Sequence, residues 1–280
     1  MTYSPVPKSQ PTPDRVLMPL KSLRGFGFDL DGCIWAGATL LPGARELVEA
    51  LRAAGRGVVF VTNSSREHAG QIAGRLTRLG IPAEASDVLA ALDLLGETIR
   101  RRVGPATVLP LGTVEMREVL EAAGHRVVGF DDWRAATAVA VGNDPAFDFG
   151  RLRAASRAVA AGATLFTVNL DPRLPVAPGE FDPGCGALTE AVAVAGGARP
   201  VVVGKPHAPI FEMALERLGC QPSEAVMVGD GLSTDIAGGR AAGMKTVWVD
   251  STSASHEPGQ ADVTVKDLAE LLDLWRDARS

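Results

Sequence analysis

The sequence contains little cysteine and no stretch of apolar residues long enough to cross a membrane. Its three cysteines, Cys33, Cys185 and Cys220, are odd in number and lack the paired spacing of a metal site. This pattern disfavours a disulfide framework and fits a reduced, cytoplasmic location. No window approaches the roughly 18 consecutive apolar residues of a membrane helix, so we expect a soluble protein with no membrane partner.

The sequence also lacks a cluster of basic residues. Its formal net charge is −5, so nucleic acid is not expected as a ligand. Of its 280 residues, 46% are hydrophobic and 22% charged, which is typical of a globular protein with one large domain or two modest ones. Residues 1–20 are rich in proline without a long apolar run, which predicts a disordered tail rather than a signal peptide.

Apolar runs of strand length alternate with amphipathic helical patterns along the chain. The alternation is interrupted at Gly104-Pro105, starts afresh, and returns to its first rhythm near residue 200. We therefore expect an α/β fold with a Rossmann-like, doubly wound parallel-sheet core at residues 21–103 and 200–280 and an inserted α/β block at 104–199. Expected helices lie near 43–54, 67–79, 87–102, 114–123, 149–161, 187–195, 210–218 and 268–275, and expected strands at 26–28, 57–61, 107–111, 126–128, 138–141, 164–168, 201–203, 225–228, 245–249 and 261–265.

Two carboxylates stand at the end of the first apolar run, in Phe26-Gly27-Phe28-Asp29-Leu30-Asp31-Gly32. Alternation along a strand would place Asp29 and Asp31 on the same side, and the carboxyl end of a parallel strand faces a ligand crevice. Two like charges so close call for a divalent cation or a shared proton. Taken alone, such a motif is more often a solvated turn.

Polar side chains also follow three other predicted strands, and in a parallel sheet these ends converge. Carboxylates suit Mg²⁺, and one of them can act as a nucleophile that forms an aspartyl-phosphate. Lysine, hydroxyl and amide groups can neutralise the charge on a transferring phosphoryl group. The set therefore favours phosphoryl transfer. Its members are Asp29 and Asp31; Thr62, Asn63 and Ser64; Lys205; and Asp230 with Asp235.

These four segments, in this order, resemble the four motifs of the haloacid dehalogenase superfamily. Residues 168–172 and 183–186 are similar to the large α/β cap of its phosphatases, among them phosphoglycolate, glycerol-phosphate, pyridoxal-phosphate and p-nitrophenyl phosphatases. The resemblance extends from Leu23 to Trp275. It implies a Mg²⁺-dependent phosphoric monoester hydrolase that acts on small sugar, polyol or glycolate-type phosphates, with residues 104–199 as a cap domain.

The resemblance also implies a role for each site residue. Asp29 would attack phosphorus, and Asp31 would transfer protons to the leaving alcohol and from water. Asp29, the Asp31 backbone carbonyl and Asp230 would hold Mg²⁺, and Asp235 would support these ligands. Thr62 and Lys205 would grip the phosphoryl oxygens with help from Asn63 and Ser64, and Asp171 and Arg173 would select the substrate. Family analogy adds a homodimer through the cap.

Other interpretations remain open at this point. A signalling module with a phosphoacceptor aspartate presents similar groups, although Asp31 and the large insert argue against it. The same fold could cleave carbon–halogen or carbon–phosphorus bonds. The substrate could be glycerol phosphate, phosphoglycolate, pyridoxal phosphate or a nucleoside monophosphate, with Arg173 favouring a small anionic or polyol phosphate. Residues 169–186, which contain four prolines, are expected to form a shaped binding loop, whereas Ser65, Arg66 and His68 read as the exposed start of a helix.

Overall fold

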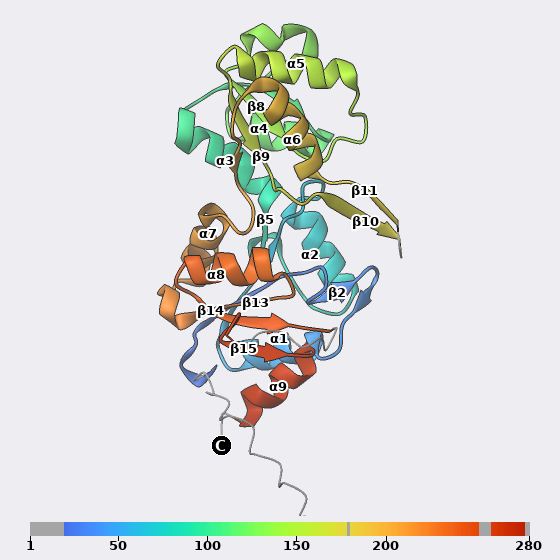
Figure 1. Cartoon of the computed structure of the whole chain (residues 1–280). Coiled ribbons are helices and arrows are strands. Elements are labelled where there is room, and N and C mark those ends of the chain that lie inside the picture. The colour runs from blue at the N-terminus through green and yellow to red at the C-terminus, as the bar shows by residue number, and fades with distance from the viewer. Residues whose placement is uncertain (1–19, 178–179, 252–258, 278–280) are drawn as a thin grey trace, which may run out of the picture.

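The computed structural model describes residues 20–177, 180–251 and 259–277, which form two lobes, each built on its own parallel sheet (Figure 1). The predicted tail lies outside the described residues apart from Leu20, which begins a short 3₁₀ turn, η1 (Leu20–Ser22). No helix among the described residues is long and apolar enough to cross a membrane.

The first lobe contains a six-stranded parallel sheet in the order β15-β14-β13-β1-β4-β5. The central strand β1 is buried along its whole length, which explains its continuously apolar sequence. The strands of this sheet are β1 (Gly25–Phe28), β4 (Gly57–Thr62), β5 (Val88–Ala90), β13 (Ala225–Gly229), β14 (Lys245–Val249) and β15 (Val263–Val265).

Helices cover both faces of this sheet, so the lobe is doubly wound. Side chains of α1 (Ala44–Ala53), α2 (Ala69–Arg78) and α9 (Leu268–Asp277) share one apolar core with Phe26, Phe28 and Phe60, whereas α7 (Ala208–Leu218) packs with Val59 and Val61 on the other face. The amphipathic patterns in the sequence follow from this burial. In α1, for example, Leu47, Val48 and Leu51 form the buried stripe.

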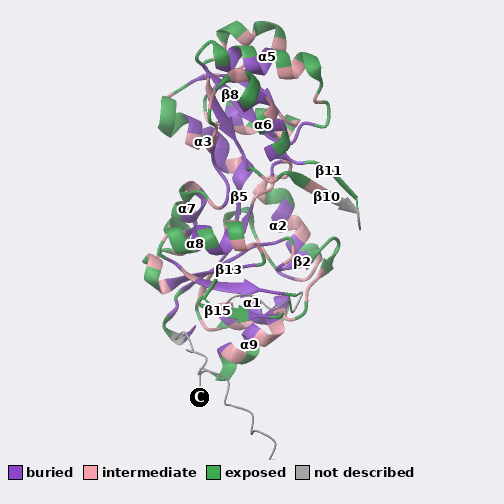
Figure 2. Cartoon of the chain, in the orientation of Figure 1, coloured by how far each residue is buried: buried purple, intermediate pink, exposed green. Residues whose placement is uncertain are grey.

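The second lobe contains a five-stranded parallel sheet in the order β12-β9-β8-β6-β7, whose three middle strands are largely buried (Figure 2). Its strands are β6 (Thr107–Leu111), β7 (Arg126–Val127), β8 (Ala138–Val141), β9 (Thr164–Thr167) and β12 (Val201–Val202), and its helices are α4 (Val114–Ala122), α5 (Phe149–Ala160) and α6 (Cys185–Gly196). The helix α3 (Ala91–Val103) contacts both α4 and α7 and so connects the lobes. The expected α/β, Rossmann-like fold class is confirmed.

Four local expectations were wrong. Residues 87–90 do not begin a helix: Val88–Ala90 is strand β5, fully buried beside β4. Residues 169–186 are not a loop, because β10 (Arg173–Ala177) and β11 (Glu180–Pro183) form an antiparallel hairpin. Prolines are tolerated there because the two strands pair only with each other and leave edges without ladder bonds. Residues 33–41, expected to be a short connection without a strand, contain a small hairpin of β2 (Trp35–Ala36) and β3 (Thr39–Leu40).

The fourth error concerns the strand that precedes Lys205. The sequence rhythm placed residues 201–203 in the core sheet, but β12 pairs in parallel with β9 of the second lobe. A strand of two residues carries too little pattern to show which sheet it joins. Lys205 therefore comes to the site from the second sheet and not from the first.

Candidate active site

The site lies where the carboxyl ends of the two parallel sheets face each other. From the first lobe, Asp29 follows β1, Thr62 ends β4 and Asp230 follows β13. From the second lobe, Asn169 follows β9 and Lys205 follows β12. Open α/β sheets bind ligands at these ends, so the two lobes enclose a single crevice.

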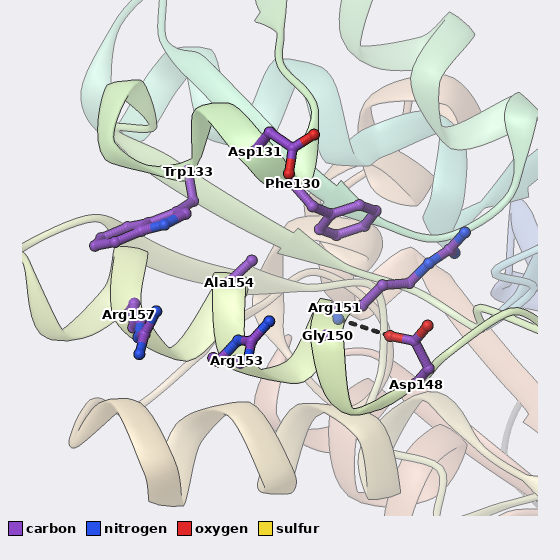
Figure 3. A pocket seen from close by; sticks show the side chains of 9 residues that line it. All are labelled: Phe130, Asp131, Trp133, Asp148, Gly150, Arg151, Arg153, Ala154 and Arg157. Atoms are coloured by element: carbon purple, nitrogen blue, oxygen red, sulfur yellow. Dashed lines mark hydrogen bonds between the residues drawn. The ribbon is translucent and has the colours of Figure 1, made fainter.

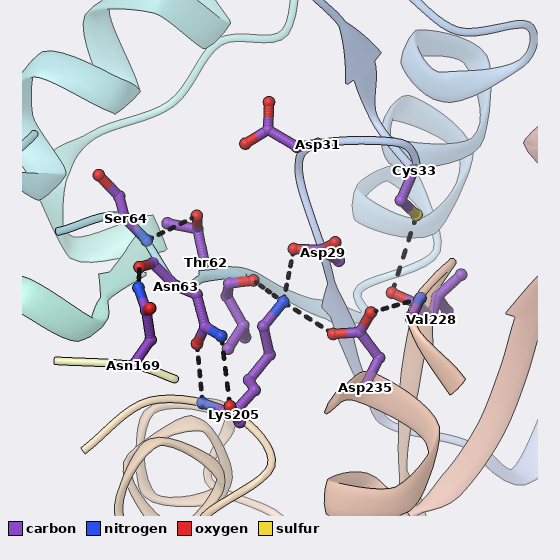
Figure 4. A network of polar contacts seen from close by, with 12 residues as sticks. Asp29, Asp31, Cys33, Thr62, Asn63, Ser64, Asn169, Lys205, Val228 and Asp235 are labelled. Atoms are coloured by element: carbon purple, nitrogen blue, oxygen red, sulfur yellow. Dashed lines mark hydrogen bonds and ion pairs between the residues drawn. The ribbon is translucent and has the colours of Figure 1, made fainter. Parts of the chain in front are cut away.

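Lys205 is the centre of the polar network in Figure 4. Its Nζ lies 2.5 Å from Oδ1 of Asp29 and 2.7 Å from Oδ1 of Asp235, and it donates to the Val61 carbonyl at 3.1 Å. The residue is only 4% exposed. Burial lowers the pKa of Lys205, but the charges of Asp235 and Asp29 outweigh burial and raise it, so the buried ammonium stays charged.

Three carboxylates gather beside this lysine. Asp29, Asp230 and Asp235 each offer an oxygen, and these oxygens lie within 4.8 Å of one another. Burial raises the pKa of Asp235 to about 7, and the charge of Asp29 adds to the shift. Asp230 reaches solvent on one side, but the enclosure of its carboxyl group and the charge of Asp29 raise its pKa to about 6. Mutual repulsion between hard oxygen ligands at this spacing fits a site for Mg²⁺.

Backbone geometry fixes the two acids of the fourth motif, Asp230 and Asp235. Asp235 lies in a π-helical turn, η5 (Leu232–Ile236), and its Oδ2 accepts from the Gly231 amide at 2.9 Å. The Asp230 carbonyl accepts from Trp248 Nε1 at 2.9 Å. Gly32 has a φ of +83°, and a Cβ there would lie 2.1 Å from Oδ2 of Asp230. Glycine at position 32 therefore lets the first and fourth motifs approach each other.

Asp31 is placed by a turn and not by the alternation of a strand, because β1 ends at Phe28. The indole Nε1 of Trp35 donates to its Oδ1 at 2.8 Å. Burial raises the pKa of Asp31, although the bond from Trp35 opposes the shift. Its carboxylate points away from Lys205 and Asp235 (Figure 4), so the two acids of the motif have different surroundings.

The polar groups of the loop after β4 bond partly to Lys205 and partly within the loop. The Asn63 amide brackets the lysine backbone: its Oδ1 accepts from the Lys205 amide at 2.8 Å, and its Nδ2 donates to the Lys205 carbonyl at 3.2 Å. Thr62 Oγ1 accepts from the Ser64 amide at 3.2 Å, and Ser64 Oγ accepts from the Glu67 amide at 3.1 Å. Asn63 therefore positions Lys205, and the Ser64 hydroxyl stabilises the turn into α2.

Of the two residues predicted to select the substrate, only Asp171 contacts this network. Its Oδ2 accepts from Asn63 Nδ2 at 3.3 Å, and burial raises its pKa. Arg173 lies on β10, exposed, with its guanidinium carbon 4.3 Å from the centre of the Phe181 ring. Among the described residues, no recorded contact joins Arg173 to Asp29 or Lys205.

Sequence reasoning missed three residues that connect the lobes. Asn169 Nδ2 donates to the Asn63 carbonyl at 2.7 Å. Arg66 reaches the second lobe at Asn143, and His68 lies 2.7 Å from Asp93 on α3 and 3.5 Å from Glu118 on α4. Reading Arg66 and His68 as a merely exposed helix start was wrong. No sequence signal marked them, because Asn143 is 77 residues away from Arg66.

Comparisons with known proteins agree with this geometry. Residues 26–126 match a family model described as haloacid dehalogenase-like hydrolase, and residues 202–271 match a second, HAD-hydrolase-like model. The chain is 36% identical over 251 residues to chronophin of Rattus norvegicus, covering 86% of this chain and 81% of chronophin. It is 36% identical to glycerol-3-phosphate phosphatase of Homo sapiens, covering 79% and 76% of the two chains.

A solved structure agrees with these sequence matches. The 4-nitrophenylphosphatase of Thermotoga maritima superposes with a TM-score of 0.82 at 26% sequence identity, covering 91% of this chain and 98% of that one. The sequence matches and the superposition extend over both lobes. The chain therefore belongs to the haloacid dehalogenase-like hydrolases.

Proposed function

We propose that this protein is a Mg²⁺-dependent phosphatase that hydrolyses small phosphomonoesters through an aspartyl-phosphate on Asp29. The observation that carries the proposal is the buried Lys205 ammonium between Asp29 and Asp235, beside the cluster that Asp230 completes. A nucleophilic carboxylate, a cation for phosphoryl oxygens and hard metal ligands thus occupy one place. The names of the relatives, which are phosphatases, support this reaction class.

The proposed reaction has two steps. An Asp29 oxygen bonds to phosphorus as the bond from phosphorus to the ester oxygen breaks, and Asp31 gives its proton to the leaving alcohol. Water then attacks phosphorus, Asp31 takes a proton from it, and inorganic phosphate and free Asp29 result. Burial raises the pKa of Asp31, which favours the protonated form that the first step needs. Lys205 and Thr62 would grip the phosphoryl oxygens, with help from the Asn63 and Ser64 backbone.

The donor set supports Mg²⁺ as the cofactor. Asp29, Asp230 and the Asp31 carbonyl would hold the ion, and Asp235 would orient this group through its bonds to Lys205 and Gly231. When bound, Mg²⁺ neutralises charge that develops on the phosphoryl group. Burial and, after it, the charge of Asp29 raise the pKa values of Asp230 and Asp235, and the ion would relieve the repulsion from Asp29.

The second lobe is proposed as the cap domain that chooses the substrate, a small phosphorylated metabolite of the sugar, polyol or glycolate type. Asp171 supports this role by reaching the loop that holds Lys205. Arg173 would act from the β10–β11 hairpin. A homodimer through this lobe and a cytoplasmic location complete the proposal. The 79% exposed Val194 on α6 supports a contact between two copies of this lobe. The free, buried thiols of Cys33 and Cys185 support the cytoplasmic location.

A panel of phosphorylated metabolites, assayed for phosphate release with Mg²⁺ and with EDTA, tests the proposal. We expect Mg²⁺-dependent turnover that Asp29→Asn abolishes while its unfolding curve stays cooperative. Substantial activity in Asp29→Asn would exclude this residue as the nucleophile. A long-lived phospho-protein after acetyl phosphate, without turnover, would favour a signalling module. Halide release from a haloacid in EDTA would favour carbon–halogen chemistry.

A further inference from the structure

Arg66 is a side chain of the first lobe that contacts the second lobe in two places. It follows the loop that brackets Lys205, and its Nε donates to Oδ1 of Asn143 at 2.6 Å. Its Nη2 lies 3.8 Å from Oδ2 of Asp182 on β11. Asn143 follows β8 at the carboxyl end of the second sheet. One guanidinium therefore spans the crevice just described.

Asn143 connects Arg66 to the hairpin of β10 and β11. Only 4% exposed, it donates from Nδ2 to the Pro183 carbonyl at 2.8 Å, where β11 ends. The Asn143 amide therefore accepts from Arg66 of the first lobe at Oδ1 and donates to the hairpin of the second lobe from Nδ2. Without Arg66, the buried Oδ1 of Asn143 would lose the charged donor that Arg66 supplies, which is unfavourable.

The residues just before β10, at the other end of the hairpin, bond to the loop after β4. Asn63 donates to Asp171, and Asn169 donates to the Asn63 carbonyl, just before β10 begins. The first end of the segment from 169 to 183 is therefore bonded to Asn63, which also brackets Lys205, and the second end is bonded to Asn143, which accepts from Arg66. Closing the lobes and assembling the phosphate site are one event in this geometry.

The central residues of the site are buried between the lobes. Asp29 is 8% exposed and Lys205 is 4% exposed, so separation of the lobes would open the path of a phosphate ester to them. We propose that Arg66 is a positioning residue whose bond to Asn143 latches the second lobe shut in each turnover and holds the hairpin over the leaving group. This inference rests on the proposed phosphatase function for its kinetic consequences alone.

The two contacts of Arg66 differ in strength. Asp182 has 55% of its side chain exposed and lies 3.8 Å away, so this ion pair contributes little. The bond to buried Asn143 is short and involves a charged donor, and such bonds are among the stronger ones in proteins. The latch is therefore the bond between Arg66 and Asn143.

Kinetics on the best ester of the metabolite panel test the latch. Arg66→Ala and Asn143→Ala should each lower kcat/KM by about 10- to 100-fold, and the double variant should be no worse than either alone. The loss should be shared between a lower kcat and a higher KM, because the closed fraction of bound enzyme falls. A purely structural defect would lower the active fraction and leave KM unchanged. Asp182→Ala should stay within about twofold.

The control is Arg78→Ala, which removes an exposed arginine from α2. A second readout does not depend on catalysis. Spin labels at Ser86→Cys in the first lobe and Arg153→Cys in the second, with Cys220 replaced by serine, report the distance between the lobes. With Mg²⁺ and orthovanadate the wild-type sequence should give a short distance, whereas Arg66→Ala should add a longer one.

The two hypotheses fail separately. If Arg66→Ala matches Arg78→Ala in both kinetics and distance, or if the effects of Arg66→Ala and Asn143→Ala simply add, the latch is refuted. If the wild-type protein releases no phosphate from any ester, the proposed function is refuted instead. The distance measurement still decides the latch in that case.

Discussion

Replacing Lys205 with methionine removes the buried cation that lies between Asp29 and Asp235. The side chains have similar length, so the change deletes charge and hydrogen bonds with little loss of volume. Two carboxylates and the Val61 carbonyl would then lie in a buried space without the ammonium that they now share. The effect on stability and on activity can therefore be estimated separately.

For stability, removing one partner of a buried ion pair costs about 3–5 kcal/mol, because the remaining charge is unpaired. Asp235, whose pKa is already raised by burial and by the charge of Asp29, would respond by taking up a proton. Raised carboxyl pKa values mean that the folded state binds more protons than the unfolded state, so the stability of the variant should rise as pH falls from 7 towards 5. Added Mg²⁺ should restore part of the stability by supplying a replacement cation.

For activity, deleting a preorganised group that stabilises transition-state charge lowers kcat about 10²- to 10³-fold. The assays are urea unfolding with and without Mg²⁺ and phosphate release at saturating ester. The matched control is Lys245→Met, because Lys245 is 44% exposed and pairs with Asp262 at 3.4 Å on the surface. A change of more than about 1 kcal/mol is not expected there.

The reasoning would be refuted if Lys205→Met kept kcat within about threefold, or if it were as stable as Lys245→Met at pH 7. The first result would remove Lys205 from the grip on the phosphoryl group. The second would show that the buried carboxylates do not need its charge. Lys205→Arg separates charge from shape: retained stability with lost activity would indicate that the placement of Nζ matters for catalysis.

Two further predictions use matched positions. Gly32→Ala should raise the Mg²⁺ concentration for half-maximal activity about tenfold or more, because the new Cβ would collide with Oδ2 of Asp230; Gly37→Ala, also at positive φ but with nothing within 4 Å, should leave the Mg²⁺ requirement unchanged. His68 is partly buried, which lowers its pKa, but Asp93 and Glu118 outweigh burial and raise it, with Glu115 also nearby. The stabilisation by His68 should therefore be fully present below its unfolded pKa of 6.5 and be lost as pH rises through the higher folded value. The melting temperature of the wild-type protein should exceed that of His68→Gln by about 1–3 °C at pH 5.5 and match it at pH 8.5, and a difference independent of pH would contradict this account.

Much of the fold was readable from the chain because the signals are local. Continuous apolar runs such as those of β1 and β13 indicate strands buried on both faces, and the stripe of Leu47, Val48 and Leu51 indicates a helix with one buried face. Short elements were misread because they contain too few residues to give a local signal. Val88–Ala90 is too brief to show a period, and the prolines of residues 169–186 concealed a hairpin.

The sequence by itself determined which side chains gather at the site. Asp29, Asp31, Lys205 and Asp230 follow apolar strands, and such positions in parallel sheets converge for a general topological reason. Only the tertiary structure decided how the two lobes meet. It showed that β12 and Lys205 come from the second sheet, that Asn63 brackets the lysine, and that Arg66 crosses to Asn143. Local sequence patterns do not encode contacts between residues 77 or 142 positions apart, because such contacts depend on how two separately patterned sheets pack against each other.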